Sequence, residues 1–130
     1  MPQKIILDTD IGDDIDDALA LGLILSSPEL HLIGVTTVFK NTVARSRQAR
    51  TLLKVAGRPN IPVAAGCGTT LSPRTEIGFD PRQAYLDEEL PIQDAASLPE
   101  DELPALDPRH GVDFIIDTLL EGRGDIILIT

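Results

Sequence analysis

The chain has few aromatic residues and almost no cysteine. Aromatic side chains make up 3% of its 130 residues, and tryptophan is absent. The single cysteine, Cys67, excludes an internal disulfide. Because 42% of the residues are hydrophobic, the chain can still bury a core, and that core must be built mainly from aliphatic side chains.

Long apolar runs are absent as well. The first apolar run ends at Asp8, too early for the core of a secretory signal. No run approaches the roughly 20 apolar residues that cross a bilayer, so we expect a cytoplasmic location. The net charge of −10 repels phosphate groups, so neither nucleic acid nor a membrane surface is expected as a partner.

Short apolar runs alternate with helical patterns along the chain. Runs rich in β-branched or aliphatic residues predict strands at residues 5–7, 30–38, 61–65 and 125–130. Longer patterns predict helices from residue 13 or 14 to 26, over 41–56 and over 111–121. This alternation predicts one α/β domain over residues 1–130, with an open, mostly parallel sheet and flanking helices.

The helical patterns also predict which side chains are buried. The first helix is apolar nearly all round, which predicts burial on most sides. In the second helix, one face is expected to be apolar and the basic side chains are expected to face solvent. The apolar set is Val43, Ala44, Leu52, Leu53 and Ala56, and the basic set is Arg45, Arg47, Arg50 and Lys54.

A proline-rich stretch over residues 66–110 separates the third strand from the last helix. It predicts a long loop over one edge of the domain, with short helical turns such as one near 81–89. The last strand is uniformly apolar, which is typical of a strand with neighbours on both sides. We therefore expect the sheet formed by this chain to be incomplete.

Six aspartates lie within ten residues, between the first strand and the first helix. They are Asp8, Asp10, Asp13, Asp14, Asp16 and Asp17. Two like charges 4 Å apart repel by roughly 4 kcal/mol at an effective dielectric of about 20. A helix amino terminus offsets only about 0.3–1 kcal/mol per group, so a bound cation is the simplest compensation. Oxygen ligands without nearby histidine or cysteine favour Ca²⁺ or Mg²⁺ over zinc.

Two known aspartate-rich loops fit this spacing poorly. Counted from Asp8 as in a calcium-binding EF-hand loop, Gly12 is fifth instead of sixth, and Leu19 stands where glutamate is required. A Mg²⁺-dependent phosphatase of the haloacid dehalogenase type would use Asp8 as its nucleophile. That type has Gly-Thr directly after the second aspartate, whereas Ile11 and Gly12 follow Asp10 here.

The acidic segment resembles the opening motif of the inosine-uridine nucleoside hydrolase family. The motif is usually Asp-x-Asp-Pro-Gly-x-Asp-Asp, and here Asp8-Thr-Asp-Ile-Gly-Asp-Asp-Ile-Asp-Asp17 takes its place. The resemblance continues in Gly34-Val-Thr-Thr-Val38 with Asn41, in Ile61-Pro-Val-Ala-Ala-Gly66 and in Asp125-Ile-Ile-Leu-Ile-Thr130. It implies the amino-terminal part of a nucleoside hydrolase-like, Rossmann-like fold.

The sequence departs from the usual motif in two ways. Ile11 replaces proline, and two extra residues precede the last aspartate pair. Matching from Gly12 would align Asp14, whereas matching from the helix aligns Asp16 and Asp17. We prefer the second alignment because the carboxylates must keep their positions relative to the helix, and Asp14 stays open as an additional ligand.

The resemblance implies hydrolysis of the N-glycosidic bond of purine or pyrimidine ribonucleosides in nucleoside catabolism or salvage. In this family a water activated by bound Ca²⁺ attacks an oxocarbenium-like centre. By carry-over, Asp10 binds the metal and accepts the proton of the water, and Asp17 and the carbonyl of Thr130 bind the metal. Asp16 is expected at the metal and the ribose, and Asn41 at the ribose. Asp8 is expected to brace the loop and Asp13 to cap the helix.

Several implications concern the protein beyond these residues. The family's remaining ligands would follow Thr130, so we expect the isolated chain to turn over nucleosides poorly. The family is commonly dimeric or tetrameric, so a homo-oligomer is expected. The alternative from another class is a non-catalytic chain, a truncated or degenerate paralogue that binds Ca²⁺ or a ribosyl ligand or serves as an interaction module.

Overall fold

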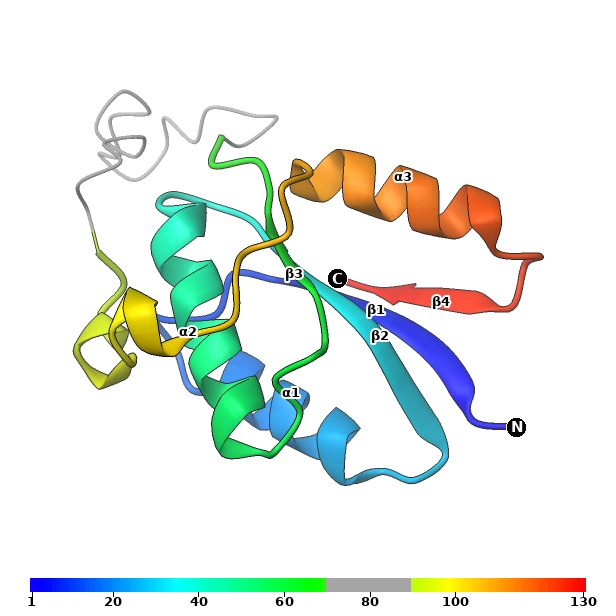
Figure 1. Cartoon of the computed structure of the whole chain (residues 1–130), viewed down its shortest axis with the longest axis horizontal. Helices are drawn as coiled ribbons and strands as arrows, with labels where there is room; N and C mark the ends of the chain where they lie inside the picture. The colour runs from blue at the N-terminus through cyan, green and yellow to red at the C-terminus, as the bar shows by residue number, and fades with distance from the viewer. Residues whose placement is uncertain (70–89) are drawn as a thin grey trace, which may run out of the picture.

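A computed structural model describes residues 1–69 and 90–130 of the chain. These residues form four parallel strands in the order β3-β2-β1-β4 (Figure 1). The strands are β1 (Gln3–Thr9), β2 (Leu30–Thr37), β3 (Val63–Ala65) and β4 (Ile126–Ile129). Their parallel order confirms the predicted α/β sheet, and it places all four carboxyl ends at one edge.

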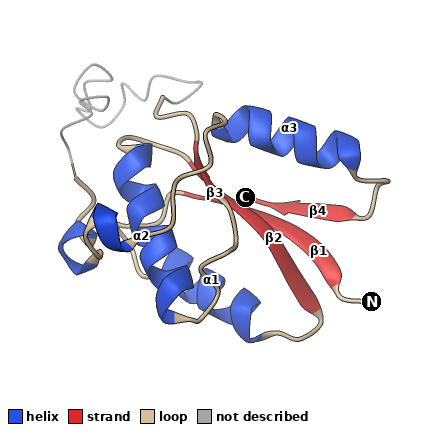
Figure 2. Ribbon diagram, viewed as in Figure 1, coloured by secondary structure: helices blue, strands red, loops and turns tan. Residues whose placement is uncertain are grey.

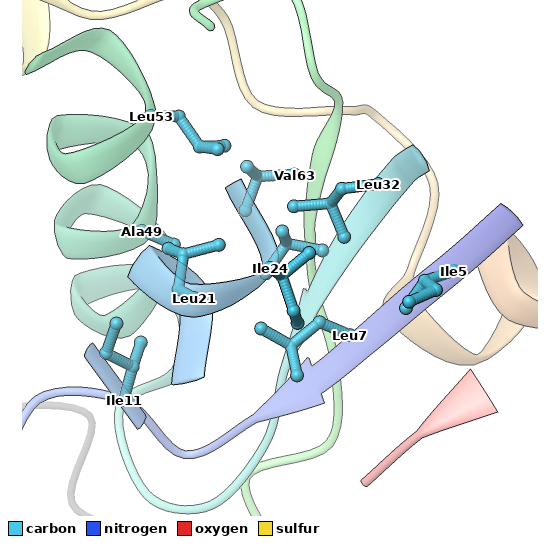
Figure 3. Packing of buried hydrophobic residues seen from close by; sticks show 10 residues of the cluster. Ile5, Leu7, Ile11, Leu21, Ile24, Leu32, Ala49, Leu53 and Val63 are labelled. Atoms are coloured by element: carbon cyan, nitrogen blue, oxygen red, sulfur yellow. The ribbon is translucent and has the colours of Figure 1, made fainter. Parts of the chain in front are cut away.

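Helices cover both faces of this sheet (Figure 2). The helices are α1 (Asp16–Ser26), α2 (Thr42–Val55) and α3 (Gly111–Glu121). Successive side chains of a strand point to opposite faces. Accordingly, Ile5 and Leu7 of β1 join a core cluster with α1 and α2, whereas Ile6 packs with Phe114 of α3. Figure 3 shows the aliphatic cluster between the sheet and the α1/α2 layer.

Helix α1 starts later than predicted and is less buried. It begins at Asp16 instead of residue 13 or 14, because Gly12 has a φ of 131° and Asp13 is held outside the helix. Its fully buried residues are Leu21 and Ile24, whereas Leu19 and Leu23 are exposed. The prediction that α1 is buried on most sides is therefore wrong for the described part of the chain.

Helix α2 buries basic side chains that were predicted to face solvent. Arg45 and Arg50 are 1% and 3% exposed, while the predicted core residue Val43 is 58% exposed. Segments far along the chain explain the difference. Arg45 pairs with the carboxylate of Asp13. Arg50 pairs with the carboxylate of Glu100, which lies in a segment that crosses α2. Helical periodicity cannot reveal such partners.

The described part of the 66–110 stretch contains two short 3-10 helical turns. They are η1 (Asp94–Ala96) and η2 (Glu100–Glu102), and the chain then returns to the sheet where Asp107 N donates to Val63 O. The helical turn predicted near 81–89 lies outside the described residues. Helix α3 matches its predicted range, and His110 caps its start by accepting a hydrogen bond from Val112 N. No helix in residues 1–69 or 90–130 is long and apolar enough to cross a membrane.

Candidate metal and nucleoside site

The acidic loop leaves the carboxyl end of β1, and its first aspartate, Asp8, is held by the neighbouring strand β2. The Oγ1 of Thr36 on β2 donates a hydrogen bond of 2.6 Å to Asp8 Oδ1. Partial burial raises the pKa of Asp8, and the bond from Thr36 opposes that rise. The carboxylate of Asp8 therefore ties β1 to β2.

The side chains of Asp10, just after β1, and Asp17, in the first turn of α1, approach each other. The Oγ1 of Thr9 donates to Asp17 Oδ1 at 2.5 Å and accepts from Ile11 N at 3.1 Å, so it joins the end of β1 to the start of α1. Asp10 is exposed overall, but partial burial of its carboxyl raises its pKa, and the hydrogen bond and negative charge of Asp17 raise it further. The pair is thus a site where negative charge is crowded.

The other aspartates of the predicted metal set are less closely placed. Asp14 and Asp16 are exposed. Residues 1–69 and 90–130 contain no group of three or more aspartate, glutamate, histidine or cysteine side chains that could hold a metal ion. From the predicted set, the structure therefore brings together Asp10 and Asp17.

Asp13 does not cap α1, contrary to the prediction. The residue before the helix is Ile15, which offers no side-chain cap. Asp13 instead accepts hydrogen bonds from Arg45 Nη2 at 2.7 Å and from Ile92 N at 3.1 Å. Burial by itself would raise the pKa of Asp13, but these bonds outweigh it and lower the pKa. Asp13 therefore anchors the loop to α2 and to residues far along the chain.

A segment after the undescribed residues clamps the same loop. Gln93 N donates to Gly12 O at 2.8 Å, and the Gln93 side chain donates to Asp13 O. A Cβ at Gly12 would lie 2.6 Å from the Cβ of Pro91, and the φ of 131° also disfavours other residues there. Glycine is thus required at this turn for two independent reasons.

Asn41 and Thr130 lie at the same edge of the sheet as the acidic loop. Asn41 follows β2 and caps α2, because its Oδ1 accepts from Ala44 N at 3.0 Å. Leu7 of β1 is in register with Ile129 of the parallel strand β4, so Thr130 emerges beside the end of β1. Ligands of open α/β sheets bind at this edge. The predicted site residues therefore share one edge, although only Asp10 and Asp17 lie against each other.

Arg45 is a second residue near the site whose position differs from the prediction, because it was expected to face solvent and is buried. It contacts the backbone of Asp10 and Ile11 as well as the carboxylate of Asp13. The spacing of residues along the sequence did not indicate that Arg45 would be buried against the acidic loop. The available signal was compositional, since α2 carries several basic residues and the acidic loop lacks a cation of its own.

Known proteins resemble this chain in sequence and in structure. The family described as inosine-uridine preferring nucleoside hydrolase matches residues 5–130. The inosine-uridine preferring nucleoside hydrolase of Leishmania major is 37% identical over 122 residues, covering 92% of this chain and 36% of that protein. A solved plant nucleoside hydrolase has a TM-score of 0.65 at 31% identity, covering 98% of this chain and 39% of its own.

A second solved structure gives the same result. The purine-preferring ribonucleoside hydrolase from Gardnerella vaginalis has a TM-score of 0.69 at 28% identity, covering 97% of this chain and 39% of its own. The chain thus spans less than two fifths of the length of these relatives, and it matches them along nearly all of its own. On these matches, together with the acidic loop at the carboxyl edge of a parallel sheet, the chain belongs to the inosine-uridine preferring nucleoside hydrolase family.

Proposed function

We propose that the protein carrying this chain hydrolyses the N-glycosidic bond of ribonucleosides, releasing ribose and a free base. The observation that carries this proposal is the Asp10–Asp17 pair at the carboxyl edge of β1, in a chain of the nucleoside hydrolase family. The names of relatives include inosine-uridine preferring, uridine and purine-preferring enzymes, so no single base is proposed.

The residues at this edge suit a hard divalent cation, and we propose Ca²⁺. Two carboxylates face each other, and the pKa of Asp10 is raised by burial and by Asp17. Such crowding is relieved when a cation shares the oxygens. Ca²⁺ accepts six to eight oxygen ligands in irregular geometry, which tolerates a site completed by carbonyls and water. When bound, it would lower the pKa of a coordinated water and orient ribose hydroxyls.

The chain's own residues take distinct roles in this proposal. Asp10 would hold the metal and, as a carboxylate beside it, accept the proton of the attacking water. Asp17, fixed by Thr9, would be the second carboxylate ligand. Carboxylates near the sugar would also stabilise positive charge that develops on it as the bond to the base breaks.

The remaining assignments concern the substrate and the rest of the metal shell. Thr130 would supply its backbone carbonyl to the metal. Asp16 would contact the metal or the ribose hydroxyls, and Asn41 would hydrogen-bond the ribose while still capping α2. Asp14 stays open as an additional ligand. The contact of Asp17 with Asp10 supports the alignment that matches the last aspartate pair of the loop to the family motif.

We also propose a cytoplasmic, homo-oligomeric protein with no nucleic-acid or membrane partner. The expectation that nucleic acid and membranes are not partners is supported by the net charge of −10, which disfavours binding to phosphate-rich surfaces. Sedimentation of the protein alone measures its oligomeric state, and sedimentation with added RNA or anionic vesicles measures binding to them.

The test combines calcium titration with base release. In calorimetric titrations, D17N is expected to weaken Ca²⁺ binding by about tenfold or more, equivalent to about 1.4 kcal/mol. D14N, a matched loss of one carboxylate from the same loop, is expected to weaken Ca²⁺ binding less than D17N, because Asp14 is exposed and is proposed at most as an additional ligand. An equal effect of the two variants would contradict the assignment of Asp17.

Hydrolysis is measured separately, as ribose released from uridine and from inosine. Calcium-dependent release that D10N abolishes supports the proposed reaction. Calcium or nucleoside binding without any release would instead support the non-catalytic alternative.

A further inference from the structure

Arg45 is a buried cation at the centre of the site's scaffold. It lies on α2 and is 1% exposed. Its Nη1 donates to the carbonyls of Asp10 and Ile11, and its Nη2 donates to Asp13 Oδ2 at 2.7 Å. The guanidinium therefore holds the acidic loop at three points, two on the backbone and one on a side chain.

The same guanidinium holds the turn that precedes Asn41. Its Nε donates to Phe39 O at 2.7 Å, and its Cζ lies 5.7 Å from the centre of the Phe39 ring. Phe39 and Lys40 have φ values of 70° and 55°, a left-handed conformation that non-glycine residues rarely adopt. Such a turn persists when its surroundings fix it, and the bonds from Phe39 N to Cys67 O and from Lys40 N to Gly68 O help to do so.

One side chain thus connects the two segments that carry the proposed metal and ribose residues. We propose that Arg45 is a positioning residue, which sets the peptide plane after Asp10 and thereby aims the Asp10 carboxylate, while fixing the turn that presents Asn41. This inference rests on the proposed function for its catalytic meaning. The clamp itself rests only on the contacts described above.

The chemistry of arginine explains why this position needs it. Its planar fork directs donors to several acceptors at fixed angles, and its buried charge is compensated by Asp13. Lysine would keep the charge but present a single ammonium group, which cannot reach Phe39 O and the acidic loop with the same geometry. Removing the charge entirely would leave Asp13 without its ion-pair partner.

The test compares Arg45 with Arg50 on the same helix. Arg50 is a matched control because it is 3% exposed, pairs with Glu100 at 2.6 Å and donates to Pro104 O at 2.9 Å, away from the acidic loop. The variants are R45K, R45M, D13N and R50M. Two quantities are measured on each folded variant, namely amide hydrogen exchange by NMR and Ca²⁺ affinity by calorimetry.

The expected result is a coupled loss that is specific to Arg45. In R45K and R45M, exchange rises at both residues 10–14 and 39–41, and Ca²⁺ affinity falls by about 10–100-fold, as when a partner of a metal ligand is removed. D13N gives a smaller change of the same kind. In R50M, exchange rises near residues 99–104 and Ca²⁺ affinity is unchanged.

Other outcomes overturn the proposal in distinguishable ways. If exchange in R45K and R45M rises at only one of the two segments, Arg45 does not couple them. If R45M fails to fold, R45K and D13N decide the same question. If all variants lose stability while Ca²⁺ affinity stays at the wild-type value, Arg45 is only structural. Absence of Ca²⁺ binding in the wild-type protein that carries this chain counts against the proposed metal site, and hydrogen exchange then still decides whether the clamp exists.

Discussion

The two faces of the sheet both carry aliphatic side chains, but the described residues pack differently on them. Between the sheet and the α1/α2 layer, the described residues form a closed cluster that includes Leu7, Leu21 and Leu53 (Figure 3). On the α3 face, the buried cluster formed by residues 1–69 and 90–130 consists of Ile6, Ala64 and Phe114. Leu120 of α3 is 79% exposed, and Leu128 of β4, which is in register with Ile6, is 37% exposed.

Position in the sheet explains this difference. Strands β1 and β2 lie in the middle of the strand order, where α1 and α2 cover them. Strand β4 pairs with β1 alone among the described strands, and α3 covers only part of its face. Apolar sequence therefore indicates what a segment can bury, whereas neighbours in space determine what it does bury. The predictions below test this contrast.

The largest effect is expected in the closed cluster. Leu21 is fully buried, so L21A should lower the free energy of unfolding by about 2–5 kcal/mol through lost burial and a cavity. The matched variant L120A, on the open face, should change it by no more than about 0.5 kcal/mol. Urea denaturation of both variants measures the difference, and similar losses would show that the two faces are equally packed.

An intermediate effect is expected where α3 meets the sheet most closely. A Cβ at Gly34 would overlap the ring of Phe114, so G34A should cost about 1–3 kcal/mol of stability. F114L in the same chain should recover part of that loss. Gly22 is the control, because a Cβ there meets nothing within 4 Å and alanine favours the helix. Destabilisation by G22A of the same size would contradict the packing argument.

The smallest effect concerns the ion pair before α3. Hydrogen bonds from Arg109 lower the pKa of Asp107 below its ordinary value of 3.8. Because the folded-state pKa is lowered, the stabilisation is complete above the ordinary value and disappears as pH falls through the folded-state value. D107N should therefore lower the melting temperature slightly at pH 7 and not at all in strong acid. A difference that persists in acid would show that the charge of Asp107 is not the cause.

Much of the candidate site could be predicted because it lies in one short segment. The aspartates, Gly12 and the helix that follows are neighbours in sequence, so their position after a strand follows from local pattern. Asn41 as a helix cap could be anticipated from residue type for the same reason. The role of Asp13 could not be predicted, because its partners Arg45 and Ile92 are distant in the chain.

The apolar periodicity of the sequence determined the strand and helix order, the parallel sheet and the edge at which the acidic loop lies. Each of these depends on interactions between residues close in sequence or on the topology that their order allows. The tertiary structure alone decided that Arg45 is buried beneath the loop and that α3 stays half covered. These outcomes depend on which distant segments occupy the same space, and a buried cation is stable only where the fold brings acceptors to it.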